Sequence, residues 1–316
     1  MSEPVIVLDH LSKSYGDVHA VQDLSLQIET GTIFGFLGPN GAGKTTTMRM
    51  LCGLTHPTAG GATIEGADVW KDRYSVRTKF GYVPQRFSLY RDLTVLENFR
   101  FFGGAYGVPS AELEPRIERL LQVIDLEEKR NTAAQSLSGG MRQLLAIGCA
   151  LVHNPSLLFF DEPTAGLDPV HRQQIWNLLY DLSNEGKTIF VTTHYMDEAE
   201  RCTEVGFIEG GRLLAKASPR ALKSSFRTRL LEIDIDPLMP ALVRLRDLPE
   251  LLGVSLRSGS LRLYAAEPEQ LMAKWRERWP FNDLHLLGER WVEPDMEDVF
   301  TAYSQGYDEV LKRSTP

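Results

Sequence analysis

The stretch GPNGAGKTT has the residue types and spacing of a phosphate-binding loop. It fits the pattern G-x4-G-K-[ST] at Gly38, Gly43, Lys44 and Thr45. Glycines let backbone N–H groups turn around an anion, and a helix N-terminus adds a favourable dipole. The lysine reaches the terminal phosphates, and the threonine hydroxyl holds Mg²⁺. We therefore predict a nucleotide-binding loop made of Gly38, Pro39, Asn40, Gly41, Ala42, Gly43, Lys44, Thr45 and Thr46.

Two adjacent carboxylates, Asp161 and Glu162, follow the apolar run SLLFF. Charges at the end of a buried strand are costly unless a metal or a reaction uses them. We expect Asp161 to act on Mg²⁺ and Glu162 to polarise an attacking water as a base. His194 follows the predicted strand TIFVTT, which places it at the same ligand-binding edge of a parallel sheet. A structural role is expected for the other histidines: His10, His19, His56, His153, His171 and His285.

A second glycine-rich helix start, LSGGMRQ at residues 137–143, also has residues that suit a phosphate. The sequence thus contains two candidate phosphate-binding helix starts in one chain. This duplication needs an explanation, because a single nucleotide requires only one such loop.

The elements that position these residues follow from the spacing of apolar side chains. The run TIFGFL is nearly all apolar, which is typical of a buried parallel strand, and SLLFF and TIFVTT are predicted to be the second and third strands of the same kind. Residues from about 89 to 152 show the i, i+3, i+4 spacing of helices. We predict an α/β parallel sheet with a helical insertion. From about residue 226 the pattern becomes β-α-β-β-α-β and a final helix, which predicts a small α+β domain.

Composition narrows the class of protein. The chain has 316 residues, 43% of them hydrophobic and 24% charged, which is ordinary for a soluble protein. Its net charge of -8 argues against nucleic acid as the main partner. The start, MSEPVIVLDH, lacks the pattern of a signal peptide, and no apolar run reaches the length of a membrane span. We expect a cytoplasmic protein with three reduced thiols, Cys52, Cys149 and Cys202.

In their order along the chain, these motifs resemble the nucleotide-binding subunit of ATP-binding cassette (ABC) transporters, over roughly residues 4 to 220. The resemblance implies a P-loop NTPase core of the α/β class, with an antiparallel β subdomain and a helical subdomain at about residues 88–153. This nucleotide-binding domain would span residues 1–225. Residues 226–316 would form the accessory α+β domain.

The resemblance also implies roles for individual residues. Tyr15 would stack on adenine, and Gln85 would touch Mg²⁺ and sense the transmembrane subunit. His194 would contact the γ-phosphate as a switch residue. The metal set would be Thr45, Gln85 and Asp161, and the catalytic set Lys44, Glu162 and His194. Parts of the motifs that face a second subunit would be Ser138, Gly139, Gly140 and Asp168.

In this family, two subunits pack head to tail around two ATP molecules. The phosphate loop of one subunit holds each nucleotide, and the signature helix of the other, here starting at Ser138, closes over it. A chain with one copy of each motif is therefore expected to form a homodimer when ATP is bound.

Two details favour an export ATPase that serves a separate transmembrane permease on the cytoplasmic face of the membrane. Met141 follows the signature glycines, and PDMEDVF at residues 294–300 is close to the PSLEDVF-like segment of such exporters. Alternatives are an importer subunit, a soluble ABC ATPase acting on the ribosome or DNA, and a cassette that binds ATP without hydrolysis. Intact Lys44, Asp161, Glu162 and His194 argue against the last.

Aromatic residues near Gln85 allow two interpretations. They could line the groove in which a permease docks, or they could fill the core of the helical insertion, which we expect for most of them. The residues are Phe87, Tyr90, Phe99, Phe101 and Phe102.

Overall fold

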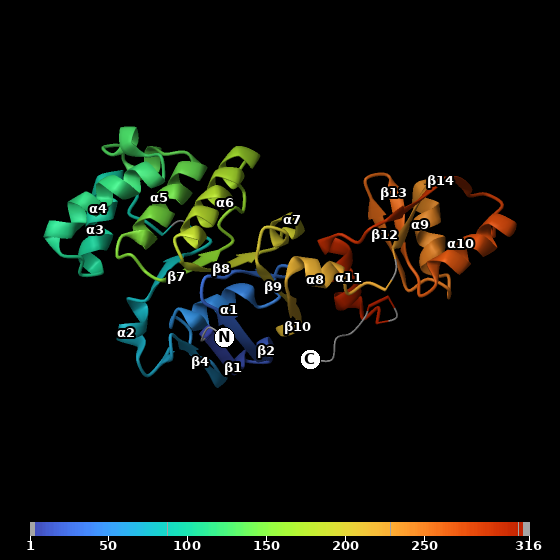
Figure 1. Cartoon of the computed structure of the whole chain (residues 1–316), viewed down its shortest axis with the longest axis horizontal. Helices are drawn as coiled ribbons and strands as arrows, with labels where there is room; N and C mark the ends of the chain where they lie inside the picture. The colour runs from blue at the N-terminus through green and yellow to red at the C-terminus, as the bar shows by residue number, and fades with distance from the viewer. Residues whose placement is uncertain (1–3, 87, 228, 309, 312–316) are drawn as a thin grey trace. The chain divides into compact units, whose positions relative to one another are not determined.

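The computed structural model describes residues 4–86, 88–227, 229–308 and 310–311. The chain folds into two compact units, residues 1–216 and 217–316, which are taken in turn below (Figure 1). The first unit contains both glycine-rich motifs and every residue that the sequence analysis assigned to a site. The second unit starts ahead of the change predicted near residue 226.

A six-stranded sheet is the scaffold of the first unit. Strand β3 is parallel to β8 and β9, and β7 is parallel to β6 and β8. Every residue of β3, β7 and β8 is buried, as expected for parallel strands covered on both faces. The carboxyl ends of β3, β8 and β7 therefore lie side by side. Across the sheet the strands are β10 (Arg212–Ala217), β9 (Glu204–Glu209), β3 (Ile33–Leu37), β8 (Thr188–Thr193), β7 (Leu157–Asp161) and β6 (Phe80–Val83).

Helices connect these strands. The longest of them, α6, starts where proline favours a first helical turn, and the side chain of Asp168 caps it. Its apolar face is buried, with Trp176 the largest residue there. The helices are α1 (Lys44–Leu51), α2 (Arg73–Arg77), α5 (Gly139–Leu151), α6 (Pro169–Asn184) and α7 (Met196–Ala199).

A second, antiparallel sheet belongs to the same unit. Its side chains share one hydrophobic core with α1 and with residues of β3, β7 and β8. The antiparallel β subdomain implied by the resemblance is therefore present in the fold. In order across the sheet the strands are β2 (Val18–Glu29), β1 (Pro4–Tyr15), β4 (Ala59–Ile64) and β5 (Ala67–Asp68).

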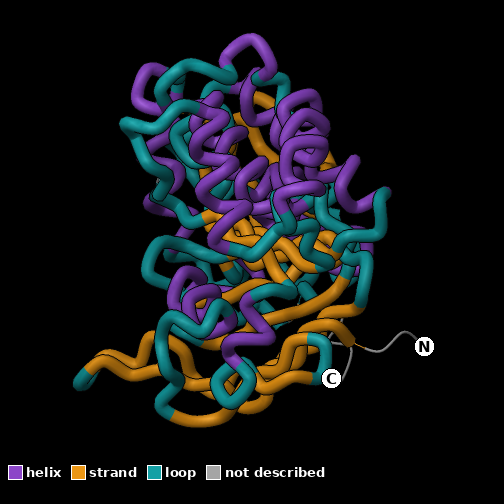
Figure 2. The backbone as a smooth tube through the Cα atoms, turned by 90° about the vertical axis from the view of Figure 1, so that its left-hand side faces the viewer, coloured by secondary structure: helices purple, strands orange, loops and turns teal. Residues whose placement is uncertain are grey.

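The segment from residue 89 to 152 is largely helical, as predicted. It contains α3 (Val95–Ala105), α4 (Ser110–Val123) and α5, with short 3-10 turns between the last two. A capping box at Thr94 and Glu97 starts α3. Phe99 is fully buried among these helices, whereas Phe101 on the same helix is exposed. Figure 1 shows α3, α4 and α5 together at one end of the unit, and in Figure 2 they lie above its strands.

The second unit has the predicted β-α-β-β-α-β order and a final helix. Its four strands form an antiparallel sheet in the order β12-β13-β11-β14. A short helix, α8, packs against the last helix, which is why this unit begins at residue 217. The elements are α8 (Pro219–Lys223), β11 (Leu230–Asp236), α9 (Leu238–Arg246), β12 (Gly253–Arg257), β13 (Ser260–Tyr264), α10 (Pro268–Glu277), β14 (His285–Val292) and α11 (Met296–Gln305).

The PDMEDVF segment contains the start of α11 and bonds this helix to the sheet. Asp295 caps the helix by accepting from the N–H groups of Glu297 and Asp298, both at 2.9 Å. Asp298 is fully buried and accepts from Arg257 at 3.0 Å and from the Tyr264 hydroxyl at 2.8 Å. A buried carboxylate is tolerated when it is paired and hydrogen-bonded in this way. The segment thus has a structural role in the second unit.

Candidate functional site

The phosphate loop joins the end of β3 to the start of α1. Gly43 caps α1 with a φ of 107°. A Cβ atom there would approach the carbonyl oxygen of Ala20 to 2.5 Å, so the position requires glycine on two grounds. The first N–H groups of α1 have no partner within the helix, which makes its N-terminus suited to an anion.

A cavity of about 340 Å³ opens beside this loop. It combines the phosphate loop with Gln85, which follows β6, and with Glu162, which follows β7. The volume lies in the range of small-molecule sites, roughly 300–1,000 Å³. The lining residues are Ala20, Asn40, Gly41, Gly43, Lys44, Thr45, Thr46, Gln85 and Glu162.

Lys44 is only 4% exposed and lies between the loop and the catalytic carboxylate predicted from the sequence. Its Nζ donates to the carbonyl oxygens of Gly38 at 2.7 Å and Pro39 at 3.1 Å. It also forms an ion pair with Glu162 Oε1 at 3.4 Å. A buried ammonium needs such partners. Phosphate oxygens entering the cavity would compete with them for the same N–H donors.

The carboxylate of Glu162 contacts three other predicted site residues, Lys44, Gln85 and His194. Its Oε2 accepts from Gln85 Nε2 at 3.0 Å and lies 3.2 Å from His194 Nδ1. With Lys44 on Oε1, three side chains from separate segments hold one carboxylate. Glu162 has a φ of 50°, a conformation rare outside glycine, and its N–H donates to the carbonyl oxygen of Thr192. Such backbone strain is found where surrounding structure fixes a functional side chain.

Asp161 lies at the end of β7 beside the threonine of the phosphate loop. Its Oδ1 accepts from Thr45 Oγ1 at 3.2 Å and from Thr192 Oγ1 at 2.7 Å. Burial raises the pKa of Asp161, and these two hydroxyls lower it in part. A cation would favour the charged form of this buried carboxylate, and the donor set is all oxygen, as Mg²⁺ prefers. The residues therefore fit the predicted magnesium site.

The described residues contain no group of three or more His, Cys, Asp and Glu side chains placed to hold a metal. Mg²⁺ is usually bound by one or two carboxylates together with waters and substrate phosphates. The magnesium site would thus be completed by the nucleotide.

The structure does not bring every predicted residue to this cavity. Tyr15, Ser138, Gly139, Gly140 and Asp168 are all described, and none of them lines it. Tyr15 ends β1 with its ring about half exposed, and Lys13 Nζ lies 4.9 Å from the ring centre. An exposed ring at this place is free to stack on a base.

The signature residues start α5. Ser138 caps this helix by accepting from the N–H of Met141 at 3.2 Å, and Gly139 is exposed. Gly140 is buried against the ring of His171, which in turn lies 2.5 Å from Asp168 Oδ2. The hydrogen bond from His171 lowers the pKa of Asp168. The signature helix α5 and the first turn of α6 thus contact each other within one chain.

His171 was expected to have a structural role, and its contacts with Gly140 and Asp168 are of that kind. The spacing did not identify its partner Gly140, which lies on another helix.

Gly140→Ala tests this contact. A Cβ at residue 140 would lie 1.9 Å from His171 Cδ2, so the ring or the helix must move. We expect a lower ATP hydrolysis rate, partly restored in Gly140→Ala/His171→Ala, where the obstructing ring is gone. Steady-state hydrolysis of the single and double variants measures this. An unchanged rate in Gly140→Ala would contradict it.

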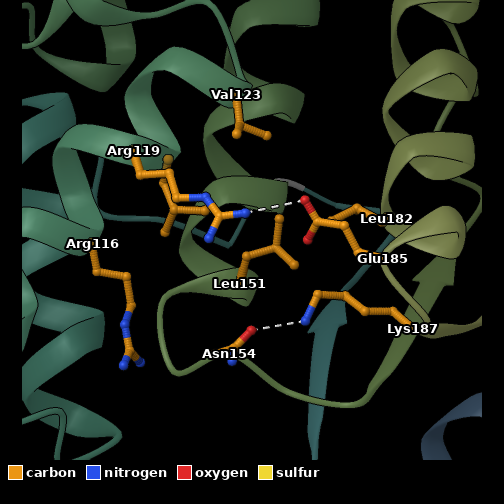
Figure 3. Close-up of a pocket in the computed structure, with 9 residues that line it drawn as sticks. Arg116, Arg119, Val123, Leu151, Asn154, Leu182, Glu185 and Lys187 are labelled. Atoms are coloured by element: carbon orange, nitrogen blue, oxygen red, sulfur yellow. Dashed lines mark hydrogen bonds and ion pairs between the residues drawn. The ribbon is translucent and has the colours of Figure 1, made fainter.

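A second cavity, of about 230 Å³, lies between α4 and the turn that follows α6 (Figure 3). Its cations already have partners. Arg119 pairs with Glu185 at 3.2 Å, and Lys187 donates to Asn154 Oδ1 at 2.9 Å. This cavity contains none of the predicted site residues.

The geometry defines a class of protein: an ATPase in which a phosphate loop and a buried carboxylate face one cavity. The profile of the family described as ABC transporter matches residues 21–165. Nod factor export ATP-binding protein I of Cupriavidus pinatubonensis (strain JMP 134 / LMG 1197) is 40% identical over 301 residues, 94% of this chain and 89% of that protein. The probable multidrug ABC transporter ATP-binding protein YbhF of Escherichia coli (strain K12) is 42% identical over 222 residues, 70% of this chain and 38% of that protein.

Solved structures agree with this class. The cbiO1 subunit from Clostridium perfringens, part of the ABC transporter complex cbiONQ, has a TM-score of 0.65 and 28% identity, over 71% of this chain and 92% of that chain. The ATP-binding cassette MJ0796, a dimer in a post-hydrolysis state with ADP and Pi, has a TM-score of 0.62 and 29% identity. The match covers 67% of this chain and 98% of that chain. This chain belongs to the ABC transporter family. It binds and hydrolyses ATP as the ATPase subunit of a transporter.

Proposed function

We propose that the chain works as a homodimer that closes head to tail around two ATP molecules. The observation that carries this proposal is the division of the motifs. The phosphate loop, Gln85 and Glu162 share a cavity, whereas Ser138 to Gly140 lie outside it. A second copy would supply Ser138 and the start of α5 to the γ-phosphate. The dimeric state named for MJ0796 supports dimerisation.

Within each site, we propose that Lys44 and the loop N–H groups bind the terminal phosphates. Glu162 accepts a proton from the attacking water, and His194, on the same carboxylate oxygen as Gln85, donates to the γ-phosphate. Tyr15 stacks on adenine. Thr45, Gln85 and Asp161 hold Mg²⁺, which offsets phosphate charge when bound.

Hydrolysis breaks the bond between the β- and γ-phosphates, and release of the inorganic phosphate then removes the negative charge that attracted both helix starts. The dimer is expected to loosen, which is a local electrostatic change acting on a two-state assembly. Asp168, in the loop before α6, faces the second subunit in this proposal, and its contact with His171 passes any movement on to Gly140.

We propose that this cycle drives export through a separate permease. The names of the relatives, a Nod factor exporter and a probable multidrug transporter, support export over import. The described residues include no helix long and apolar enough to cross a membrane. We propose attachment to the cytoplasmic face of the membrane through the permease, and the net charge of -8 argues against nucleic acid as a partner. Residues 1–225 would be the nucleotide-binding domain, with a helical subdomain at about 88–153, and residues 226–316 an accessory domain.

An exposed aromatic cluster is the surface that we propose for permease docking. Tyr90 and Phe101 meet edge to face with ring centres 4.4 Å apart, and Phe102 lies 5.4 Å from Phe101. Tyr90 and Phe101 are both more than two-fifths exposed. Phe99 instead fills the helical core, and Phe87 lies outside the described residues.

Phe101→Asp is expected to separate hydrolysis from membrane attachment. The charge would oppose burial of the cluster against a permease, while the isolated chain keeps its ATP hydrolysis rate because Phe101 is on the surface. The measurement is the share of the chain that sediments with cell membranes and co-purifies with a permease. Tyr74→Asp, another exposed aromatic, is the control. Normal attachment of Phe101→Asp would contradict the docking site, and a ribosome-bound pool would favour the soluble alternative.

A further inference from the structure

Glu198, on the short helix α7 that follows His194, is a buried charge with no role in the proposed chemistry. Its exposed fraction is 0%. A carboxylate in such a place is costly unless several donors bind it. Its donors therefore show which segments the protein holds together at this point.

Two threonine hydroxyls donate to this carboxylate from the two segments that carry the site. Thr164 Oγ1 donates to Oε1 at 2.6 Å, and Thr193 Oγ1 donates to Oε2 at 2.6 Å. Thr164 lies two residues after Glu162, and Thr193 directly precedes His194. Both threonines are buried. The carboxylate of Glu198 thus links the backbone next to the base with the backbone next to the switch histidine.

A third donor comes from α6, one turn after the loop that contains Asp168. Arg172 Nη2 lies 3.1 Å from Glu198 Oε1 and also 3.1 Å from Asp197 Oδ2. Its guanidinium lies 4.4 Å from the centre of the Tyr195 ring. Arg172 therefore balances the buried charge and attaches α6 to the segment that follows His194.

We propose that Glu198 is a positioning residue for ATP hydrolysis, which holds the segments of Glu162 and His194 at a fixed separation. Glu162 and His194 are 3.2 Å apart, a distance that small movements of either loop would change. A misplacement of about 1 Å in an active site can cost on the order of 100-fold in rate. The proposal rests on the proposed roles of Glu162 and His194.

Thr164→Val and Thr164→Ser form the matched test. Valine keeps the shape of threonine and removes the hydroxyl that reaches Glu198, whereas serine keeps the hydroxyl. We expect kcat for ATP hydrolysis to fall at least about tenfold in Thr164→Val, because the loop after Glu162 loses its hydrogen bond to Glu198. The ATP dissociation constant should stay unchanged, since Thr164 is not among the residues lining the cavity. Thr164→Ser should hydrolyse ATP at a rate close to the parent chain.

Further variants separate this proposal from a general loss of stability. Glu198→Gln keeps the volume and should lower kcat in the same way. Asp197→Asn is the control, because Asp197 also forms an ion pair with Arg172 but is exposed. The ATP hydrolysis rate of this variant should equal that of the parent chain. Thermal unfolding of each variant shows that the chain is folded at the assay temperature. If Glu198→Gln fails to fold, the comparison of Thr164→Val with Thr164→Ser still tests the positioning role of Glu198.

Glu162→Gln and His194→Ala in the same assay distinguish two kinds of failure. If these two lose hydrolysis and Thr164→Val does not, the positioning role of Glu198 is wrong and the site stands. Equal losses in Thr164→Val and Thr164→Ser would also overturn it, since the hydroxyl would not matter. If Glu162→Gln keeps its rate, the proposed catalytic role itself fails.

Discussion

Replacing Glu162 by glutamine is expected to lower the ATP hydrolysis rate by about 10²-fold or more, the usual contribution of a positioned base. The amide has nearly the same shape, and it can still bond to Gln85 and His194. It cannot accept a proton from the attacking water. Lys44 keeps its two loop carbonyls, so the ATP affinity should be retained. Phosphate release and equilibrium ATP binding, measured on the same preparation, check both parts.

The control for this prediction is Glu128→Gln, which makes the same chemical change on an exposed turn. It should hydrolyse ATP like the parent chain. A Glu162→Gln variant with near-parent turnover would remove Glu162 from the catalytic set.

Replacing Lys44 by alanine is expected to weaken ATP binding by roughly 10- to 100-fold. A hydrogen bond to a charged group contributes about 1.5–3 kcal/mol, and each 1.4 kcal/mol is a factor of ten in affinity. Alanine also leaves Glu162 without its cation, which adds repulsion toward the phosphates. Titration of the variant with ATP gives the dissociation constant directly.

Lys71→Ala is the control, because that lysine is exposed on the surface. Thermal unfolding of both variants without nucleotide separates binding from stability. An unchanged dissociation constant for a folded Lys44→Ala chain would be incompatible with the phosphate contact proposed for this residue.

Much of the fold could be predicted from the sequence, because its signals are local. TIFGFL and SLLFF are apolar at nearly every residue, TIFVTT combines apolar residues with β-branched threonines, and each contributes a buried parallel strand. The β-α-β-β-α-β pattern of the second unit was also correct. The boundary between the two units differs from the one predicted near residue 226, because α8 belongs to the second unit through its packing against α11. Local sequence patterns do not predict such packing.

The site was predictable where it depends on the ends of strands. Residues after parallel strands meet at one sheet edge, so Lys44, Glu162 and His194 could be expected together. The contact of Gln85 with Glu162 depends on β6 lying beside β7, and strand order cannot be read from spacing. Glu198 was missed for the same reason. The sequence separates Thr164 from Thr193, and only the pairing of β7 with β8 brings them to one carboxylate.

The same physical reason explains the two glycine-rich helix starts. Lys44 to Thr46 line a cavity with Glu162, and Ser138 to Gly140 lie outside it at the start of α5. Local spacing predicts a phosphate site for each motif and cannot say that only the first of them lines the cavity of Glu162. Their separation in the fold is what makes a second subunit necessary in the proposed mechanism.

The most direct test of this shared site is the mass of Glu162→Gln in solution with MgATP, measured by light scattering. We expect a dimer, with twice the 35.6 kDa of one chain. Adding Gly139→Glu should return it to a monomer with ATP still bound. Residue 139 has room for a Cβ, since its nearest neighbour would be Leu167 Cδ2 at 3.8 Å, and a carboxylate there would repel the γ-phosphate across the interface. A Glu162→Gln chain that stays monomeric when saturated with ATP, or a dimer that persists with Gly139→Glu, would contradict the head-to-tail arrangement.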